Sequence, residues 1–239
     1  MITTAALCPA PPLLARELTG ADPVLPELRQ ACLDAAAALL CSAPDLVAVV
    51  GVADKTRAWD PDAGLDLSAY APALGAGPAG PAGPAGLPLP LPLPLGLGNR
   101  LLAQAGYAGR RELHSIGEHE QAETCAALGA LLADAGPRVA LLVMADGSAR
   151  RGIKAPGYLD SRSAPFDAEV ERAVRVGDMA ALLALDAALA QALMATGRPA
   201  WQVLAGAMNG PRPASVIRYR DDPFGVAYLV ASLTVSPPE

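Results

Sequence analysis

The residues of this chain best suited to chemistry are polar side chains that follow apolar runs. Two of them come after the run 45–52 (DLVAVVGV), and the others follow the run 138–145 (RVALLVMA). They are Asp54, Lys55, Asp146, Ser148 and Lys154. In open α/β sheets, ligands bind beyond the carboxyl ends of the strands. We therefore predict that these five residues converge on one pocket, as catalytic or ligand-binding groups.

The two lysines, Lys55 and Lys154, are the only ones in the chain. A lysine in a partly buried pocket can act as a base or hold an anionic substrate, because burial lowers its pKa. One hypothesis is therefore an enzyme with proton-transfer or anion-binding chemistry. The competing interpretation is a set of solvated loop charges in which Asp146 caps a turn.

The other candidate segments do not match a known catalytic or binding motif. Asp54-Lys55-Thr56 is not a phosphate-binding loop, because Val49 and Asp54 stand where that motif needs glycine. Ser148 lies in DGS rather than in the G-x-S-x-G turn of a nucleophilic serine. Cys8 has no positive charge beside it that would favour the thiolate, so we expect a buried structural thiol.

The two histidines are the next candidates for a metal site. His114 and His119 could join Glu118 or Glu123 in a site of two histidines and one carboxylate. Such sites commonly take ligands four residues apart on one helix face, and a spacing of five across a glycine is poor. We predict no metal here and place His119 in the first turn of an exposed helix.

The elements that must position these residues alternate along the chain. Apolar runs predict strands at 2–7, 45–52, 138–145, 215–219 and 226–233, and helical spacing predicts helices at 26–41, 99–105, 118–135, 167–176, 179–194 and 199–208. Continuous apolar runs are typical of strands buried on both faces. The alternation predicts a single α/β domain over 1–239, with a central mostly parallel or mixed sheet flanked by helices.

Residues 71–98 differ from the rest in composition. They contain the repeat GPAGPAGPAG and then alternate leucine with proline. We expect a disordered or polyproline-II surface insertion within the domain, since three triplets are too few for a collagen helix. An alternative function follows from it, a non-catalytic interaction or scaffold protein that uses this proline-rich segment to dock a partner.

Composition excludes several classes of protein. The chain has 24 acidic and 18 basic residues, a net charge of −6, which is unfavourable for binding nucleic acid. No apolar stretch reaches the roughly 20 residues of a membrane span, and the N-terminus is unlike a signal peptide. The four cysteines of the chain lack zinc-binding spacing, so we expect reduced thiols in a cytoplasmic protein. Homo-oligomers remain possible.

Five segments, taken in order, resemble the class III extradiol ring-cleavage dioxygenases, specifically the catalytic B subunit and its Memo-like relatives. The segments are CPAPPLLARELTG, DLVAVVGVADK, LLVMADGSARR, GRPAWQVLAGAM and DDPFGVAYLVA. In the same order, they are similar to five features of the family. These are its P-H-P-P-L-L start, a strand that ends in a short loop, a strand before a G-x-S-H turn, a late helix and a closing P-Y-G-V-G-Y strand. The resemblance spans nearly the whole chain.

The resemblance implies an α/β fold and Fe(II)-dependent opening of catechol-type rings. The ligand histidines of the family would fall at Ala10 and near Asp54, and its acid/base histidine at Ala149. No acidic residue lies between Asp186 and Asp221 to supply the late carboxylate. We therefore expect a diverged member without the iron cofactor, which binds a small molecule in the residual pocket at the carboxyl ends of the strands.

Overall fold

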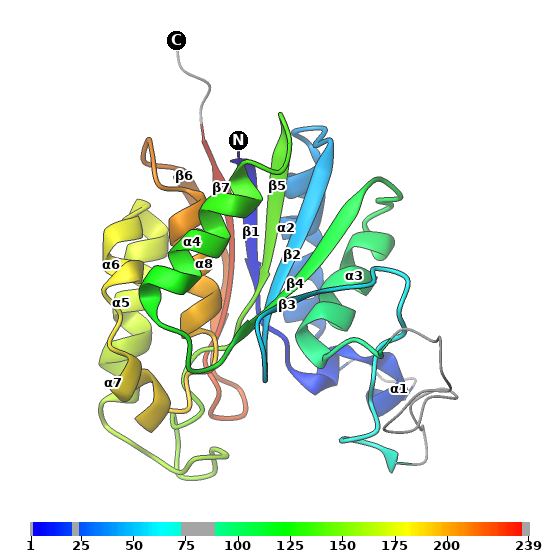
Figure 1. The fold of residues 1–239 in the computed structure, drawn as a ribbon. Helices are drawn as coiled ribbons and strands as arrows, with labels where there is room; N and C mark the ends of the chain where they lie inside the picture. Colours follow the sequence, from blue (N-terminus) through cyan, green and yellow to red (C-terminus); the bar gives the residue numbers. More distant parts are fainter. Residues whose placement is uncertain (1, 21–23, 73–88, 236–239) are drawn as a thin grey trace.

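A computed structural model of the chain describes residues 2–20, 24–72 and 89–235, which form a single α/β domain around a seven-stranded mixed sheet (Figure 1). The strands are β1 (Ile2–Cys8), β2 (Leu46–Ala53), β3 (Arg57–Trp59), β4 (Arg111–Gly117), β5 (Val139–Met144), β6 (Ala214–Asp221) and β7 (Tyr228–Thr234). Their order across the sheet is β3-β4-β2-β5-β1-β7-β6. The four neighbours β4, β2, β5 and β1 run parallel, whereas β3 and β7 are antiparallel to their neighbours, as β6 is to β7.

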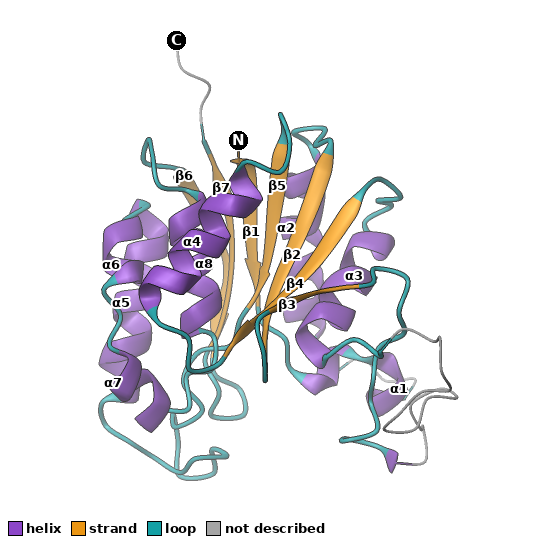
Figure 2. Ribbon diagram, viewed as in Figure 1, coloured by secondary structure: helices purple, strands orange, loops and turns teal. Residues whose placement is uncertain are grey.

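Two layers of helices cover the two faces of the sheet (Figure 2). One face packs against α2 (Pro26–Leu40) and α3 (Leu93–Gln104). The other face is covered by α4 (Ala122–Ala133), α5 (Ser163–Val176), α6 (Met179–Leu183), α7 (Ala187–Ala192) and α8 (Arg198–Ala207). A 3₁₀ turn, η1 (Pro12–Leu14), and the short helix α1 (Arg16–Thr19) follow β1.

The central strands explain why their sequences read as continuous apolar runs. In β2, Val47 and Val49 face the core under α2 and α3, whereas Ala48 and Val50 face the core under α4 and α8. Alternate residues of a strand point to opposite faces, so both sets must be apolar when both faces are covered. The predicted fold class and all five predicted strands are confirmed.

The region around the histidines differs from the prediction. Two strands, β3 and β4, were not predicted, and α4 begins at Ala122 rather than at residue 118. His114 therefore lies on β4, and His119 lies in the turn that precedes α4. The predicted helix 179–194 is divided into α6 and α7, because Asp186 caps a new helix by accepting a hydrogen bond from the Leu189 amide at 2.7 Å.

The C-terminal boundary predicted for the insertion, residue 98, is wrong. Residues 73–88, including the G-P-A repeat, lie outside the described part of the chain. Residues 89–98 are ordered: α3 begins at Leu93, and Leu91 and Leu95 are fully buried. Prolines suit this start because the first turn of a helix leaves its amides unpaired, so a missing N–H costs nothing. The last residues of the leucine–proline alternation, from Leu93 onward, therefore belong to a helix and not to the predicted insertion.

Within the described ranges, we find no helix with both the length and the apolar character needed to cross a membrane. The four cysteines are free; Cys41 is exposed, and the others are buried.

Candidate functional site at the carboxyl edge of the sheet

The carboxyl ends of the four parallel strands meet at one edge of the sheet, the lower edge in Figure 1. The loops after β1, β2 and β5 all leave this edge. Both lysines therefore lie at the same end of the sheet, as the hypothesis of a shared pocket requires. Their side chains, however, have different surroundings.

Asp146 joins two of these loops. Its carboxylate Oδ1 accepts a hydrogen bond from the Ala10 amide at 2.8 Å, and its carbonyl accepts one from the Gly197 amide at 2.9 Å. The residue is largely but not completely buried. Burial raises the pKa of Asp146 to about 6, and the single amide donor from Ala10 only partly opposes this rise. A carboxyl group with this pKa changes charge close to neutral pH.

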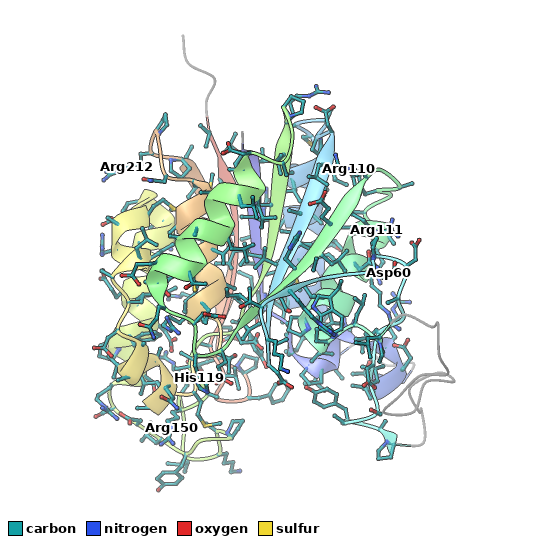
Figure 3. All side chains as sticks on the ribbon, viewed as in Figure 1. Asp60, Arg110, Arg111, His119, Arg150 and Arg212 are labelled. Atoms are coloured by element: carbon teal, nitrogen blue, oxygen red, sulfur yellow. The ribbon has the colours of Figure 1, made fainter. Side chains whose placement is uncertain are left out.

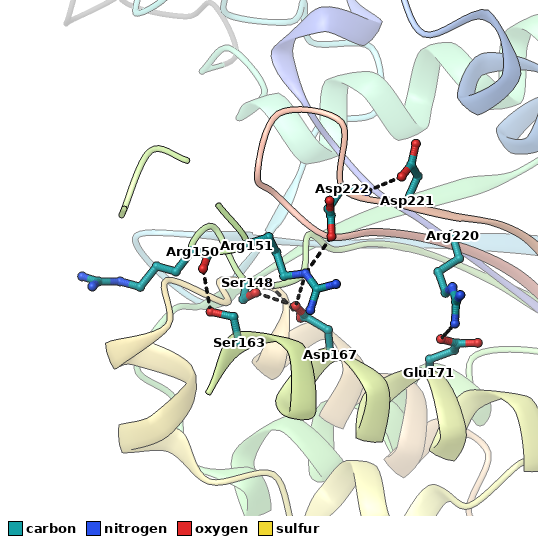
Figure 4. A network of polar contacts seen from close by, with 9 residues as sticks. All are labelled: Ser148, Arg150, Arg151, Ser163, Asp167, Glu171, Arg220, Asp221 and Asp222. Atoms are coloured by element: carbon teal, nitrogen blue, oxygen red, sulfur yellow. Dashed lines mark hydrogen bonds and ion pairs between the residues drawn. The ribbon is translucent and has the colours of Figure 1, made fainter. Parts of the chain in front are cut away.

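Ser148 turns toward a different set of residues, shown in Figure 4. Its hydroxyl donates to Asp167 Oδ2 at 2.5 Å, and its amide donates to Asp167 Oδ1 at 2.9 Å. Arg151 Nε lies 2.8 Å from Asp222 Oδ2 and 3.8 Å from Asp167 Oδ2. This network ties the loop after β5 to α5 and to the turn between β6 and β7. Ser148 is fully buried in it and serves to hold the loop.

Asp54 and Lys55 line a cavity of about 610 Å³ beside the end of β2. The lining also includes two aromatic side chains, Trp59 and Tyr70. The guanidinium of Arg57 stacks on the Trp59 ring, 3.5 Å from the ring centroid. The cavity therefore offers aromatic surface next to positive charge.

The backbone around Lys55 is held by buried hydrogen bonds. The buried Ser115 hydroxyl donates to the Lys55 carbonyl at 2.6 Å and accepts from Trp59 Nε1 at 2.8 Å. Thr56 Oγ1 donates to Glu120 at 2.6 Å and accepts from the Gly117 amide at 3.0 Å. These bonds fix the main chain, while the Lys55 side chain remains exposed.

Tyr70 is the second aromatic residue of the lining. Its side chain is half exposed, and its pKa is raised first by burial and then by the negative charge of Asp146. The structure thus brings Asp54 and Lys55 together in this cavity, whereas Asp146 lies at the same edge of the sheet without lining it. It does not bring in Ser148, and Lys154 is exposed in the loop after β5 without lining this cavity.

Sequence reasoning missed both aromatic residues of the cavity. Trp59 lies on β3, a strand of three residues that is too short for a periodic signal. Tyr70 follows an irregular segment, and no pattern predicts its position. The chain contains only two tryptophans and five tyrosines. This scarcity is a signal in the sequence that could have drawn attention to them as candidate ligand contacts.

The residues present do not fit an iron site of the resembled type. Ala10 and Ala149 occupy two of the expected positions, and alanine has no donor atom. His114 Nε2 lies 3.6 Å from Glu112, and burial lowers its pKa, whereas His119 is exposed near the lower edge in Figure 3. Across residues 2–20, 24–72 and 89–235, no group of three or more histidine, cysteine or acidic side chains could hold a metal ion.

Comparisons with known proteins bear on the fold. No family model and no curated protein matches the sequence. A similar solved structure is that of the uncharacterized protein JW3007 from Escherichia coli K12, which covers 98% of this chain and 100% of its own, with a TM-score of 0.59 and 14% sequence identity. At this identity the likeness shows a shared fold and nothing of activity.

Proposed function

We propose that this protein is a diverged, non-dioxygenase relative of the extradiol ring-cleavage enzymes that binds a small aromatic acid without iron. The proposal rests on the family resemblance of the sequence and on one structural observation. That observation is the cavity of about 610 Å³ at the carboxyl edge, which is lined by Lys55, by the stacked pair Arg57–Trp59 and by Tyr70.

The lining of the cavity favours this class of ligand. Its volume lies within the range of about 300–1,000 Å³ typical of small-molecule sites. Trp59 and Tyr70 supply flat apolar surface for a ring, and the Lys55 ammonium is a compact charge suited to a carboxylate. Asp54 and Asp66 also line the cavity, so its formal charge is close to zero. This balance favours a monoacid over a dianion.

Thermal unfolding with and without ligand tests the proposal, since a ligand of the folded state raises the midpoint. We expect 4-hydroxybenzoate to raise it and cyclohexanecarboxylate, of similar charge but without an aromatic ring, to do so far less. Lys55→Ala should abolish the shift. Lys154→Ala is the matched control, because it removes the other lysine at the same edge but outside the cavity. Equal shifts in the two variants would refute the site.

Metal analysis tests the second half of the proposal. Protein purified without added metal should contain iron far below one atom per chain, because alanine stands at two expected ligand positions. Stoichiometric iron, retained through dialysis, would refute the proposal that the iron site has been lost.

Asp146 favours a second candidate, an enzyme of proton transfer at the same edge. A general base works best with a pKa near the operating pH, and the pKa of about 6 suits that role. Any turnover of a bound aromatic acid should then follow the ionisation of Asp146 and disappear in Asp146→Asn while binding persists. Turnover that survives Asp146→Asn would exclude it.

A further inference from the structure

A second cavity, of about 420 Å³, lies between α2 and α3 beneath α1. Its apolar wall consists of aliphatic and sulfur-containing side chains without an aromatic ring. These are Leu14, Leu33, Leu97, Leu101, Met144 and Cys32. It is separate in its lining from the cavity at Lys55, and the proposed function does not use it.

The polar side of this cavity is strongly positive for an acidic protein. Three arginines line it, Arg16, Arg29 and Arg100, and Glu17 is the one acidic side chain in the part of the lining that the structure describes. Glu17 pairs with Arg100 at 2.8 Å, and both side chains are about two-fifths exposed. Among the described lining residues, the positive charges of Arg16 and Arg29 therefore have no carboxylate partner.

Arg29 is fixed in place by backbone groups. Its Nε donates to the Val24 carbonyl at 2.9 Å, and Nη1 donates to the Leu14 carbonyl at 2.8 Å, with a further bond from Nη2 to the Leu13 carbonyl. Its pKa is lowered by burial and by the neighbouring charge of Arg16. Arg16 is exposed and Arg29 is half-buried, and an anion beside both would offset the repulsion between their charges.

We propose that this cavity binds an aliphatic carboxylate, with the carboxylate between Arg16 and Arg29 and the alkyl chain along Leu33, Leu97 and Met144. Arg16 suits this role because the planar donors of an arginine match a carboxylate. Most donors of Arg29 are taken by main-chain carbonyls, so Arg29 contributes mainly its charge. The absence of aromatic lining favours a flexible alkyl chain over a ring. The cavity would accept a medium-length acyl chain, and octanoate is a suitable probe.

Methyl resonances of methionine give a local readout of binding. Of the five methionines in the chain, Met144 lies in the cavity wall, whereas Met179, Met194 and Met208 lie elsewhere. In protein labelled with ¹³C at the methionine methyl groups, octanoate should shift the Met144 resonance in a saturable manner. Octanol, which keeps the chain but lacks the charge, should bind at least tenfold more weakly.

Charge variants complete the test. Arg16→Gln should weaken octanoate binding at least tenfold, whereas Arg212→Gln should leave it unchanged. The control removes one positive charge from a position at the opposite edge, as Figure 3 shows for Arg212. Arg29 is left intact because it supports the main chain.

Three results would overturn the inference. They are no shift at Met144, equal binding of octanol and octanoate, or equal loss of octanoate binding in Arg16→Gln and Arg212→Gln. The outcome is independent of the aromatic-acid site, since that site is followed through Lys55→Ala and does not involve Met144.

Discussion

At the scale of single residues, Asp146 carries the clearest electrostatic consequence. Its side chain lies where the loops after β1 and β5 meet, with the Ala10 amide as its hydrogen-bond donor. Burial raises its pKa from 3.8 to about 6, so the folded protein holds this proton more tightly than the unfolded chain does. The contribution of Asp146 to the free energy of unfolding is therefore greatest at low pH and falls as pH rises from about 4 to about 6.

Asp146→Asn should remove the decrease in the free energy of unfolding that ionisation of Asp146 causes as pH rises. The asparagine amide oxygen can still accept from Ala10, but the side chain cannot ionise. Relative to the wild type, the variant should gain stability across pH 4 to 6 and stay about 2 kcal/mol more stable above it, given about 1.4 kcal/mol per pKa unit and the remaining solvent contact. Urea unfolding at pH 4, 5, 6 and 8 measures the difference. A difference that does not change with pH would contradict the assignment.

How far the site could be predicted from the sequence also becomes clear at this scale. Asp54, Lys55 and Asp146 could be placed at one edge, because each follows an apolar run and parallel strands end together. Side-chain direction could not be predicted. Ser148 lies two residues after Asp146, yet it turns to Asp167 on α5, a partner 19 residues away. Such directions depend on tertiary contacts that no local pattern encodes.

At the scale of elements, the contact between α4 and α8 depends on two glycines. A Cβ atom at Gly129 would overlap the carbonyl oxygen of Val203, and one at Gly206 would overlap that of Ala126. Backbones that approach this closely leave no room for a methyl group. The two helices therefore pack through their main chains over the core that includes Trp201.

Gly129→Ala should consequently lower the free energy of unfolding by about 2 kcal/mol through overpacking, although alanine is the better helix former. Gly152→Ala is the control, because no atom lies within 4 Å of the added Cβ and its φ is not positive. We expect the control to change stability by less than about 0.5 kcal/mol in urea unfolding. A stabilised Gly129→Ala would show that the helices lie further apart.

The boundary of the proline-rich segment is testable in the same way. Leu95→Ala should cost about 2–5 kcal/mol, because Leu95 is fully buried on α3. Leu89→Ala removes the same atoms from a side chain that is half exposed and should cost far less. Equal effects of the two substitutions on the urea midpoint would restore the prediction of a loop through residue 98.

The elements that the sequence predicts well are those whose burial is regular. The central strands and α2 have unbroken apolar patterns, so their existence and type follow from periodicity. Strands β3 and β4 lack such a pattern: β4 reads RELHSIG, with polar residues at its half-buried start, and β3 has three residues. β4 is a strand because it pairs with β2 and β3, and β3 is one because it pairs with β4; these pairings are long-range.

At the scale of the whole molecule, the two hydrophobic cores share the same strands. Leu7, Leu141 and Val143 belong to the core under α8, whereas Ala6 and Leu142 belong to the core under α2 and α3. Neither core can open without exposing the other face of these strands. The described part of the chain should therefore unfold as one cooperative unit, including the short edge strand β3.

The two tryptophans make this prediction measurable. Trp201 is buried on α8 in one core, and Trp59 lies on β3 beside the proposed ligand cavity. In Trp59→Phe the fluorescence reports Trp201, and in Trp201→Phe it reports Trp59. For each variant, the fluorescence midpoint in urea should coincide with the midpoint from circular dichroism at 222 nm, because a single transition governs both. A Trp59 transition at lower urea would mean that the edge carrying Lys55 opens on its own. The rigid cavity on which the proposed function depends would then not exist in the unliganded protein.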